Sequence, residues 1–493
     1  MMSVHLPHLQ VIFPLIASPL CLLVRNPFAN WLLATLVSWL TFAIAVLLLL
    51  QVLDAGVITY ALGNWVAPWG IEYVVDELNA FILVIVSGIG AVVMPYAMRS
   101  VSGELPDRQI SLFYTMFLLC LSGLLGITIT GDAFNVFVFL EISSLSSYAL
   151  ISLGRHRKAL HASYQYLITG TIGATFFLIG VGLLYMMTGT LNMKDLASLL
   201  KPLSDSRIVL AAFGFIVVGM GLKLAVFPLH LWLPNAYAYA PSVVSVFLAG
   251  TATKVSLYVV LRFIFTVFGF EFSFIGQPLG LALLILAISG IITCSLVAIF
   301  QIDVKRLLAW SSVAQIGYML LGLSFATVIG VQASLLHIFN HAIMKTGLFL
   351  AMGCVFLRIG SCRLKDLSGI GRQMPWTMAG FTICGLSLIG VPTTAGFVSK
   401  WYLVLSAFEK GWWPVALLIV LTSLLAVIYI WKVVEVAWFH EPSDAVKAVS
   451  EAPFLMLVPL WIVVGANIWF GFETSGSVDV AAAAAKALVG TVR

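Results

Sequence analysis

The sequence predicts an all-α polytopic membrane protein with about 14 transmembrane helices. Of its 493 residues, 61% are hydrophobic and only 9% are charged, and the mean hydropathy is +1.09. Apolar stretches of about 20 residues, long enough to cross a bilayer, follow one another with short connections. This composition excludes an ordinary soluble domain, and the sparse charge excludes a nucleic-acid-binding surface.

The predicted spans are residues 5–24, 31–52, 77–98, 110–129, 131–152, 161–187, 208–227, 242–266, 277–300, 305–324, 327–357, 376–407, 413–438 and 452–472. We expect a single integral membrane domain over residues 1–493, because no soluble domain is inserted between spans. It divides into three N-terminal helices (1–109), a first repeat (110–268), a second repeat (269–440), and a last helix with a tail (441–493). The first span follows His5 and His8 rather than a Lys/Arg-rich segment, so we interpret it as a retained helix and not a cleaved signal peptide.

Basic residues in the loops predict the orientation of the chain. If the N-terminus is outside, the inner loops contain thirteen Lys/Arg: Arg25, Arg99, Arg108, Arg155, Arg157, Lys158, Lys305, Arg306, Arg358, Arg363, Lys365, Arg372 and Lys447. The outer segments contain six: Lys194, Lys201, Arg207, Lys410, Lys486 and Arg493. This bias predicts an even number of helices with both termini outside.

The stretch Gly221–Ser242, GLKLAVFPLHLWLPNAYAYAPS, places a lysine beside a broken helix. Lys223 stands inside an apolar span, and Pro228, Pro234 and Pro241 each remove a backbone donor. Broken helices at membrane depth are tolerated where they line protein or water, and intramembrane charges usually mark function. The alternative is a lysine that snorkels to the nearby interface.

A second break is predicted in GLSLIGVPTTAGFVSK. Gly385, Leu386, Leu388 and Pro392 repeat the spacing of Gly221, Leu222, Leu224 and Pro228. Interrupted helices at corresponding positions of two halves are typical of transporters with inverted repeats. We therefore predict broken helices 7 and 12 within two five-helix repeats, helices 4–8 and 9–13.

Two further charges lie near the middle of predicted spans. Glu141 is about ten residues from either end of its span, or about 15 Å, which is too far for its carboxylate to reach an interface. Lys254 lies about thirteen residues after Pro241. The alternatives are a protonated, hydrogen-bonded structural glutamate and a lysine bonded to backbone carbonyls.

A stripe of titratable residues occupies the 327–357 span. His337, His341 and Lys345 follow at spacings of four, which places them on one face of a helix about 6 Å apart. Such a row resembles a proton relay, whereas either histidine alone is equally explained as a satisfied core residue. Lys400, after the second break, ends the series. His230, on the first break, is a possible addition with structural and functional roles equally supported.

Other polar residues predict structure rather than transport. Arg262 and the Lys432/Glu435 pair lie towards span ends and are interpreted as interfacial anchors. The six cysteines are scattered, with no C-x-x-C spacing, so they predict neither a disulfide framework nor a metal site. The identity of any bound metal is left open.

Together these motifs resemble the antiporter-like subunits of respiratory complex I and of Mrp-type cation/proton antiporters. The resemblance rests on the glutamate span, the run from Gly221 to Ser245, the mid-helix Lys254 and the H-x-x-x-H-x-x-x-K stripe. GDAFNVFVFLEISSLSSYALI and LYMMTGTLNMKDLA are most similar to the D-type subunit of the multisubunit Mrp-type sodium/proton antiporters. By motif position, the resemblance implies a proton path through Glu141 and Lys223 as an ion pair, Lys254 as a connecting lysine, His337, His341 and Lys345 as a relay, and Lys400 as a terminal lysine.

The resemblance also implies the setting of the protein. The family has no cofactor and works in a hetero-oligomer with other membrane subunits, in contact with lipid, in a bacterial cytoplasmic membrane. The first hypothesis is therefore a proton-translocating subunit of a multisubunit Na+/H+ antiporter, a secondary transporter subunit and not an enzyme. The alternatives are a proton-pumping subunit of an NADH:quinone oxidoreductase or membrane-bound hydrogenase, and a scaffold whose charges only hold helices together.

Overall fold

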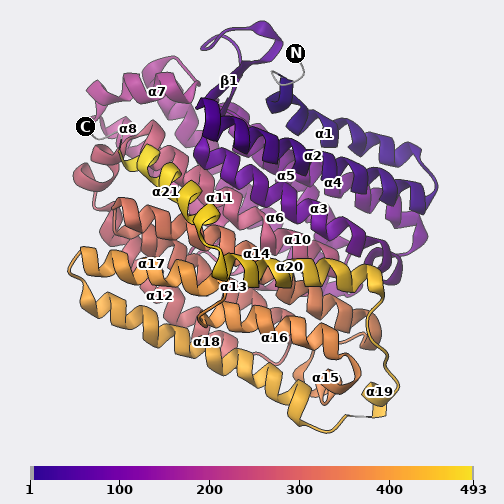
Figure 1. Ribbon diagram of the computed structural model, residues 1–493. Coiled ribbons are helices and arrows are strands. Elements are labelled where there is room, and N and C mark those ends of the chain that lie inside the picture. The colour runs from indigo at the N-terminus through magenta and orange to yellow at the C-terminus, as the bar shows by residue number, and fades with distance from the viewer. Residues whose placement is uncertain (1–4, 443, 491–493) are drawn as a thin grey trace.

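The computed structural model describes residues 5–442 and 444–490 as a bundle of helices (Figure 1). Arg493, counted above among the outer charges, lies outside the described residues. Thirteen helical segments of the described chain are long and apolar enough to cross a membrane. They are α1 (Leu6–Leu23), α2 (Pro27–Ala55), α3 (Glu77–Glu104), α4 (Asp107–Ile129), α5 (Ala133–Ser152), α6 (Arg157–Thr188), α8 (Arg207–Leu224), Ser242–Val267, α12 (Leu279–Ile299), α13 (Val304–Ser324), α14 (Val328–Ile359), α18 (Trp413–Phe439) and α20 (Phe454–Phe472).

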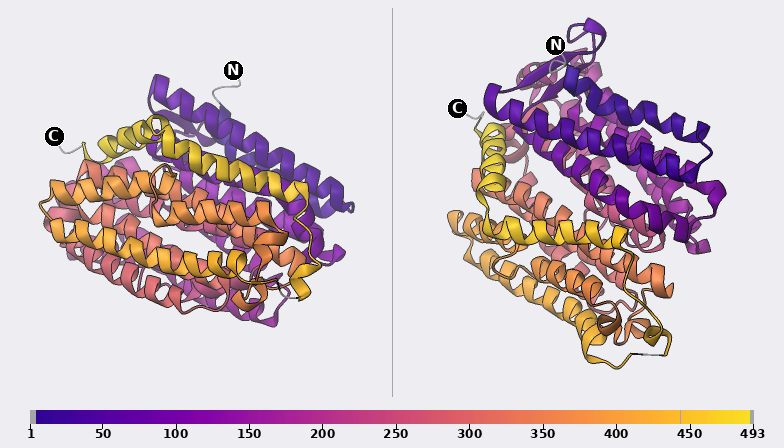
Figure 2. Two further views of the ribbon diagram at one scale, coloured as in Figure 1. Left: turned by 60° about the horizontal axis from the view of Figure 1, so that its bottom comes forward. Right: turned by 45° about the vertical axis from the view of Figure 1, so that its right-hand side comes forward.

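The fourteenth span is the predicted broken helix 12, formed by α16 (Pro375–Ile389) and α17 (Ala395–Glu409). The predicted polytopic all-α fold is thus confirmed. The start of α1 and the end of α21 (Ser475–Val489) lie towards the same end of the bundle, as an even number of crossings requires (Figures 1 and 2).

Both predicted breaks are present and have the same hydrogen-bonded ending. In the first, α8 ends at Leu224 and the chain resumes as α9 (Trp232–Tyr239), after Ala225 adopts a left-handed conformation with φ 60°. In the second, Gly390 takes that position with φ 92°. The Val226 N–H donates to the Gly221 carbonyl, and the Val391 N–H donates to the Leu386 carbonyl.

These bonds correct the register of the sequence repeat. The repeated sequence motif aligns Gly221 with Gly385, whereas the hydrogen bonds align it with Leu386. The difference of one residue arises because the proline follows the left-handed residue by three positions in the first break (Pro228) and by two in the second (Pro392).

Packing also repeats between the two halves. α4 packs on α5, α5 on α6 and α6 on α8, while α12 packs on α13, α13 on α14, and α14 on α16 and α17. Because five spans separate equivalent helices, the two halves cross the membrane in opposite directions. The most buried helices are α13 and the Ser242–Val267 segment, so Lys254 lies in the interior of the bundle.

The Ser242–Val267 segment is itself interrupted, which the sequence did not predict. It consists of α10 (Ser242–Gly250), α11 (Ala252–Leu261) and a π-helical turn, η4 (Arg262–Val267). The interruption falls at Thr251, with φ −125° and ψ −58°. π-helical turns of this kind are frequent at functional sites.

Arg262 is predicted from the sequence to be an interfacial anchor, but in the structure it forms a buried ion pair instead. Its guanidinium donates to both carboxylate oxygens of Asp76, at 2.7 and 2.8 Å, and joins the start of α3 to the end of the eighth span. Burial raises the pKa of Asp76, but the guanidinium and the backbone N–H groups of Leu78 and Asn79 lower it more, so the pKa lies below its usual value. Asp76 also forms a capping box with Asn79 that starts α3.

The connections contain short elements that were not predicted. Two antiparallel strands, β1 (Ile58–Ala61) and β2 (Glu72–Val75), form a hairpin between α2 and α3. The C-terminal helix α21 leaves α20 at a steep angle and packs on α14 and α3 (Figure 2). The remaining short helices are η2 (Leu62–Asn64), α7 (Met193–Leu200), η3 (Lys201–Leu203), η5 (Glu271–Gly276), η6 (Leu364–Leu367), α15 (Ile370–Gln373) and α19 (Asp444–Lys447).

Candidate proton path

Lys223, in the last turn of α8, points into the protein. Its ammonium donates to the Ser144 hydroxyl at 2.5 Å and to the Tyr148 hydroxyl at 3.5 Å, and only 4% of the residue is exposed. The snorkelling alternative is therefore wrong. α8 reaches this position because it packs closely on α6: a Cβ on Gly219 would lie 2.6 Å from the Gly173 carbonyl oxygen.

Glu141 lies on α5, one helical turn before Ser144. It interacts electrostatically with Lys223, but among the described residues the two do not form an ion pair within 4.0 Å. Instead, hydroxyl groups of α5 hold the ammonium. One carboxylate oxygen of Glu141 is buried without a hydrogen-bond partner in the described chain, so the carboxylate is not fixed in place.

Buried tyrosines extend from Lys223 towards the eighth span. The Tyr148 ring meets the Tyr166 ring edge to face, with centroids 4.7 Å apart, and Tyr166 interacts electrostatically with both Tyr148 and Tyr237. The Tyr237 hydroxyl donates to the Leu248 carbonyl at 3.0 Å, in the turn before the Thr251 interruption. No pattern in the sequence predicts a role for these tyrosines, although Tyr237 lies within the conspicuous Gly221–Ser242 stretch.

Lys254 is fully buried in α11. Its ammonium donates to the carbonyl of Ala249, in the last turn of α10 before the interruption. This hydrogen bond agrees with the alternative role considered for Lys254, a structural lysine bonded to backbone carbonyls. Lys254 nevertheless interacts electrostatically with His337, His341 and Lys345, so it is also part of a cluster of bases.

The stripe on α14 is buried and lies along one face. The rings of His337 and His341 are stacked, with centroids 6.2 Å apart and planes 7° apart. His337 is held on both sides, by the Ser399 hydroxyl at 2.9 Å and the Gln315 side-chain oxygen at 3.0 Å. Neither ring nitrogen of His341 has a hydrogen-bond partner in the described chain, so this ring is free to bind water or to exchange partners.

Lys345 ends the stripe. Its ammonium donates to the Leu308 carbonyl at 2.8 Å and to the Ser311 hydroxyl, both on α13. The spacing of four residues thus brings the three groups together as predicted, with Gln315 and Ser311 of α13 as partners that the spacing did not reveal.

Lys400, on α17, turns back towards the second break. It donates to the carbonyls of Leu388 and Ile389, at 3.0 and 2.8 Å, and to the Ser423 hydroxyl at 3.0 Å. The preceding residue, Ser399, bonds to His337, and Lys400 itself interacts electrostatically with that histidine. Lys400 therefore adjoins the histidine stripe and also caps the C-terminus of α16.

His230 lies apart from this series. It is buried between Phe227 and Trp310, with ring centroids 5.3 and 5.2 Å away. Its Nδ1 atom has no partner in the described chain. We therefore regard it as a residue of the first break that, within the described chain, forms no hydrogen bond or ring contact with the other candidates.

The described site residues form two groups. Glu141 and Lys223 lie in the first half, and Lys254, His337, His341, Lys345 and Lys400 form a connected cluster in the second half and at the centre. Tyr148, Tyr166 and Tyr237 lie between the two groups. No group of three or more His, Cys, Asp or Glu side chains suited to hold a metal ion occurs in the described parts of the chain.

The family described as NADH:quinone oxidoreductase/Mrp antiporter, transmembrane, matches residues 130–426, more than half of the chain and the whole of this series. The chain belongs to this family. It is 43% identical over 481 residues to the N-type subunit of the NADH-quinone oxidoreductase of Desulforudis audaxviator, covering 94% of each chain. It is 31% identical over 429 residues to the D-type subunit of the Na(+)/H(+) antiporter of Alkalihalophilus pseudofirmus, covering 87% of this chain and 86% of the other.

Solved structures agree on the fold. A chain of the Mrp complex from Dietzia superposes with a TM-score of 0.91 at 24% identity, covering 100% of this chain and 98% of that one. The protein is thus a multi-pass integral membrane protein, and the relatives that it resembles are named as subunits of larger assemblies.

Proposed function

We propose that this chain is a proton-translocating subunit of a multisubunit monovalent cation (Na+)/H+ antiporter in a bacterial cytoplasmic membrane, with both termini outside. The observation that supports this best is the series of titratable and hydroxyl groups that passes through both halves, from the half-buried Glu141 to the buried Lys400. Intramembrane ionisable groups arranged in series are typical of proton relays.

The two groups of residues have different chemical capacities. The ammonium of Lys223 is bonded to hydroxyls, which both donate and accept protons, so its partners are able to pass a proton on. The ammonium groups of Lys254 and Lys400 are bonded largely to carbonyls, which only accept. Transfer through the centre therefore requires these lysines to turn from the carbonyls towards His341 or His337.

The Glu141 carboxylate, which has a buried oxygen without a hydrogen-bond partner in the described chain, offers a way to couple proton transfer at Lys223 to another subunit. A Glu/Lys pair about 5 Å apart attracts by roughly 3 kcal/mol at an effective dielectric of 20. Movement of the Glu141 carboxylate towards Lys223 would hold the lysine charged, and movement away would favour release of its proton. A cation exchanged elsewhere in the complex is thereby linked to proton transfer in this chain.

The test is exchange by the assembled complex in membrane vesicles. We expect Glu141→Ala and Lys223→Ala each to abolish cation-dependent proton exchange, measured with a pH-sensitive dye. Exposed residues of matched charge provide the controls, Glu435→Ala and Lys410→Ala, which should leave exchange unchanged. Normal exchange by both path variants would refute the proposal, and a misassembled complex that still transports would favour the scaffold alternative.

A second candidate has specific support. The relative at 43% identity is named as a subunit of a quinone oxidoreductase, so this chain is also proposed as a proton-pumping subunit of a redox complex. Purification of the complex through a tag on this chain separates the two. Flavin or iron-sulfur absorbance in co-purified subunits would establish the redox complex, and their lack with retained Na+/H+ exchange would establish the antiporter.

A further inference from the structure

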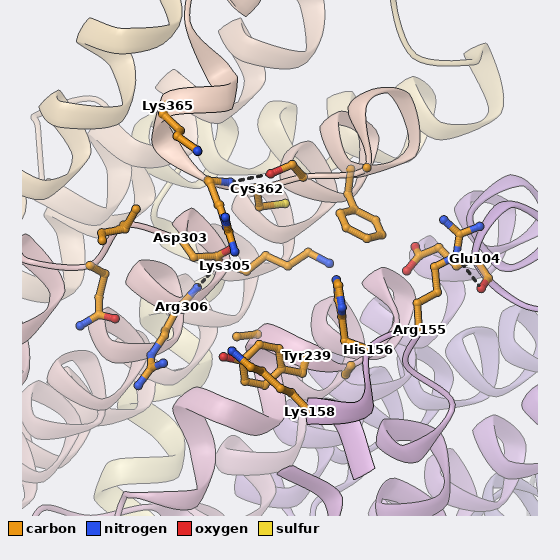
Figure 3. Close-up of a pocket in the computed structure, with 18 of the residues that line it drawn as sticks. Glu104, Arg155, His156, Lys158, Tyr239, Asp303, Lys305, Arg306, Cys362 and Lys365 are labelled. Atoms are coloured by element: carbon orange, nitrogen blue, oxygen red, sulfur yellow. Dashed lines mark hydrogen bonds between the residues drawn. The ribbon is translucent and has the colours of Figure 1, made fainter. Parts of the chain in front are cut away.

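A basic cavity of about 1040 Å³ opens between the two halves, at the face predicted to be cytoplasmic (Figure 3). Its walls come from the end of α3, the α5–α6 connection, the end of α9, the α12–α13 connection, and the segment from α14 to η6. None of the residues in the proton series lines it. The cavity is therefore a feature separate from the proposed path.

Positive charge dominates this cavity. It is lined by seven Lys and Arg residues against two acidic residues, an excess of five that equals the net charge of the whole chain. The basic residues are Arg155, Arg157, Lys158, Lys305, Arg306, Arg363 and Lys365. A positive potential of this size repels protons and Na+, so the cavity is unsuited to admit the transported cations.

The carboxylates of the two acidic residues accept hydrogen bonds from backbone N–H groups. Glu104 accepts hydrogen bonds from the Ser242 N–H at 3.0 and 3.2 Å, and Asp303 accepts one from the Arg306 N–H at 3.0 Å. Burial raises the pKa of the Asp303 carboxyl. In the described part of the chain, neither carboxylate forms an ion pair within 4.0 Å with a basic side chain of the cavity, although Lys305 and Arg363 act electrostatically on Asp303 from a greater distance.

Several basic groups remain available for a ligand. The side chains of Arg157, Arg363 and Lys365 are exposed and make no hydrogen bond or ion pair within the described residues. The Nε atom of Arg306 is buried without a partner there. Lys305 extends across the cavity towards His156, with its ammonium bonded to the Ser242 hydroxyl at 2.8 Å (Figure 3).

Apolar side chains stand at the edge of the same cavity. Phe300 and Ile302, on the α12–α13 connection, are 78% and 67% exposed. They follow directly on the last turn of a membrane span, at the depth where lipid headgroups meet acyl chains. An anionic headgroup in the cavity and an apolar chain against its edge are the two ends of one lipid molecule.

We propose that this cavity binds the phosphate headgroup of an anionic phospholipid, with its acyl chains against Phe300 and Ile302. Arginine and lysine recognise phosphate by charge-assisted hydrogen bonds, and basic pockets between spans on the cytoplasmic side hold anionic headgroups. Because the walls belong to both halves, one bound lipid joins them. The ligand also neutralises charge beside Ser242, where the span that contains Lys254 begins.

The test compares lipids on the assembled complex, purified in detergent and examined by native mass spectrometry. Phosphatidylglycerol should bind in preference to phosphatidylcholine with the same acyl chains. Each Lys or Arg near a membrane surface contributes about fivefold to the affinity for anionic lipid, so Arg363→Gln with Lys365→Gln should weaken phosphatidylglycerol binding about 25-fold. The control removes two exposed charges of the same face outside the cavity, Arg99→Gln with Arg108→Gln, and should leave binding unchanged.

Four results would overturn the proposal. Equal binding of the two lipids, or equal weakening by both double variants, would show that no headgroup site exists. Displacement of phosphatidylglycerol by millimolar inorganic phosphate would assign the cavity to a soluble anion. Loss of a protein subunit instead of lipid in the Arg363→Gln/Lys365→Gln complex would assign it to a protein partner.

Discussion

The two broken helices end alike but hold their lysines differently. In the first break, Lys223 precedes the left-handed residue and its ammonium reaches across to hydroxyls of α5. In the second, Lys400 follows the left-handed residue and turns back onto the carbonyls of its own broken helix. At the end of α8 a different residue donates: the indole N–H of Trp232 bonds to the Leu222 carbonyl at 2.9 Å, and this carbonyl also accepts from the Ala225 N–H.

This difference separates two roles that a lysine beside a break can have. Lys400 combines a charge with a structural task, because it caps carbonyls that otherwise lack donors. Lys223 has no such task, because its ammonium bonds to hydroxyls of α5 and not to the carbonyls of α8. The backbone does not separate the two breaks in the same way. The first break has Ala225 at the left-handed position that ends the helix, where the second has Gly390, but the second break has Thr393 at φ 74°. Each break therefore holds one non-glycine residue in a conformation that costs about 1–2 kcal/mol, as is typical of functional sites.

The strongest test of the comparison removes the side-chain partners of each lysine. Ser144→Ala with Tyr148→Phe deletes both hydroxyls that hold Lys223, and hydrogen bonds to charged groups contribute about 1.5–3 kcal/mol each. We expect proton exchange in vesicles to fall about 100-fold. Ser423→Ala leaves Lys400 with two carbonyls, so exchange should fall less than about threefold. Equal losses would mean that the two breaks hold their lysines in equivalent ways.

The second test separates charge from capping. Lys400→Met leaves the Leu388 and Ile389 carbonyls without their donor, so thermal unfolding of the complex should indicate a loss of about 2 kcal/mol. Lys223→Met leaves only hydroxyls, which rotate to other acceptors, and should change stability by less than about 1 kcal/mol while abolishing exchange. A larger destabilisation by Lys223→Met would reverse the assignment of roles.

The third test concerns the connection from the first break to the centre. Tyr166→Phe removes the hydroxyl of the ring that packs edge to face on Tyr148 but keeps that ring stacked on Trp232, with centroids 3.8 Å apart. Exchange should fall about tenfold, equivalent to about 1.4 kcal/mol, with no change in the unfolding temperature. Tyr164→Phe, on the same helix but 60% exposed, is the control. Unchanged exchange in the Tyr166 variant would remove the tyrosines from the path.

Much of this comparison was predictable from sequence. Prolines and glycines marked both breaks, and the apolar surroundings of Lys254 and the spacing of His337, His341 and Lys345 predicted burial on shared faces. These are local features of the sequence, and the periodicity and composition of each segment reveal them. The fourteen spans were predictable for the same reason.

The remainder depends on contacts between distant segments. Asp76 and Arg262 are 186 residues apart, and no periodicity links them. Which group meets the ammonium of Lys223 depends on how α8 packs against α5, and the interruption at Thr251 has no proline to announce it. Structure was therefore needed to replace an expected Glu141–Lys223 ion pair with a lysine held by hydroxyls.

The variant with the smallest expected effect tests whether Trp232 caps the C-terminal end of α8 at the first break. Trp232→Phe keeps an aromatic ring against Tyr166 and removes only the N–H donor to Leu222. The Leu222 carbonyl still accepts from the Ala225 N–H, so the loss should be about 0.5–1 kcal/mol, smaller than for Lys400→Met. Trp310→Phe is the matched control, because its buried indole N–H has no partner in the described chain. If both variants unfold at the same temperature, Trp232 does not cap α8, and the division of roles between Trp232 and Lys400 fails.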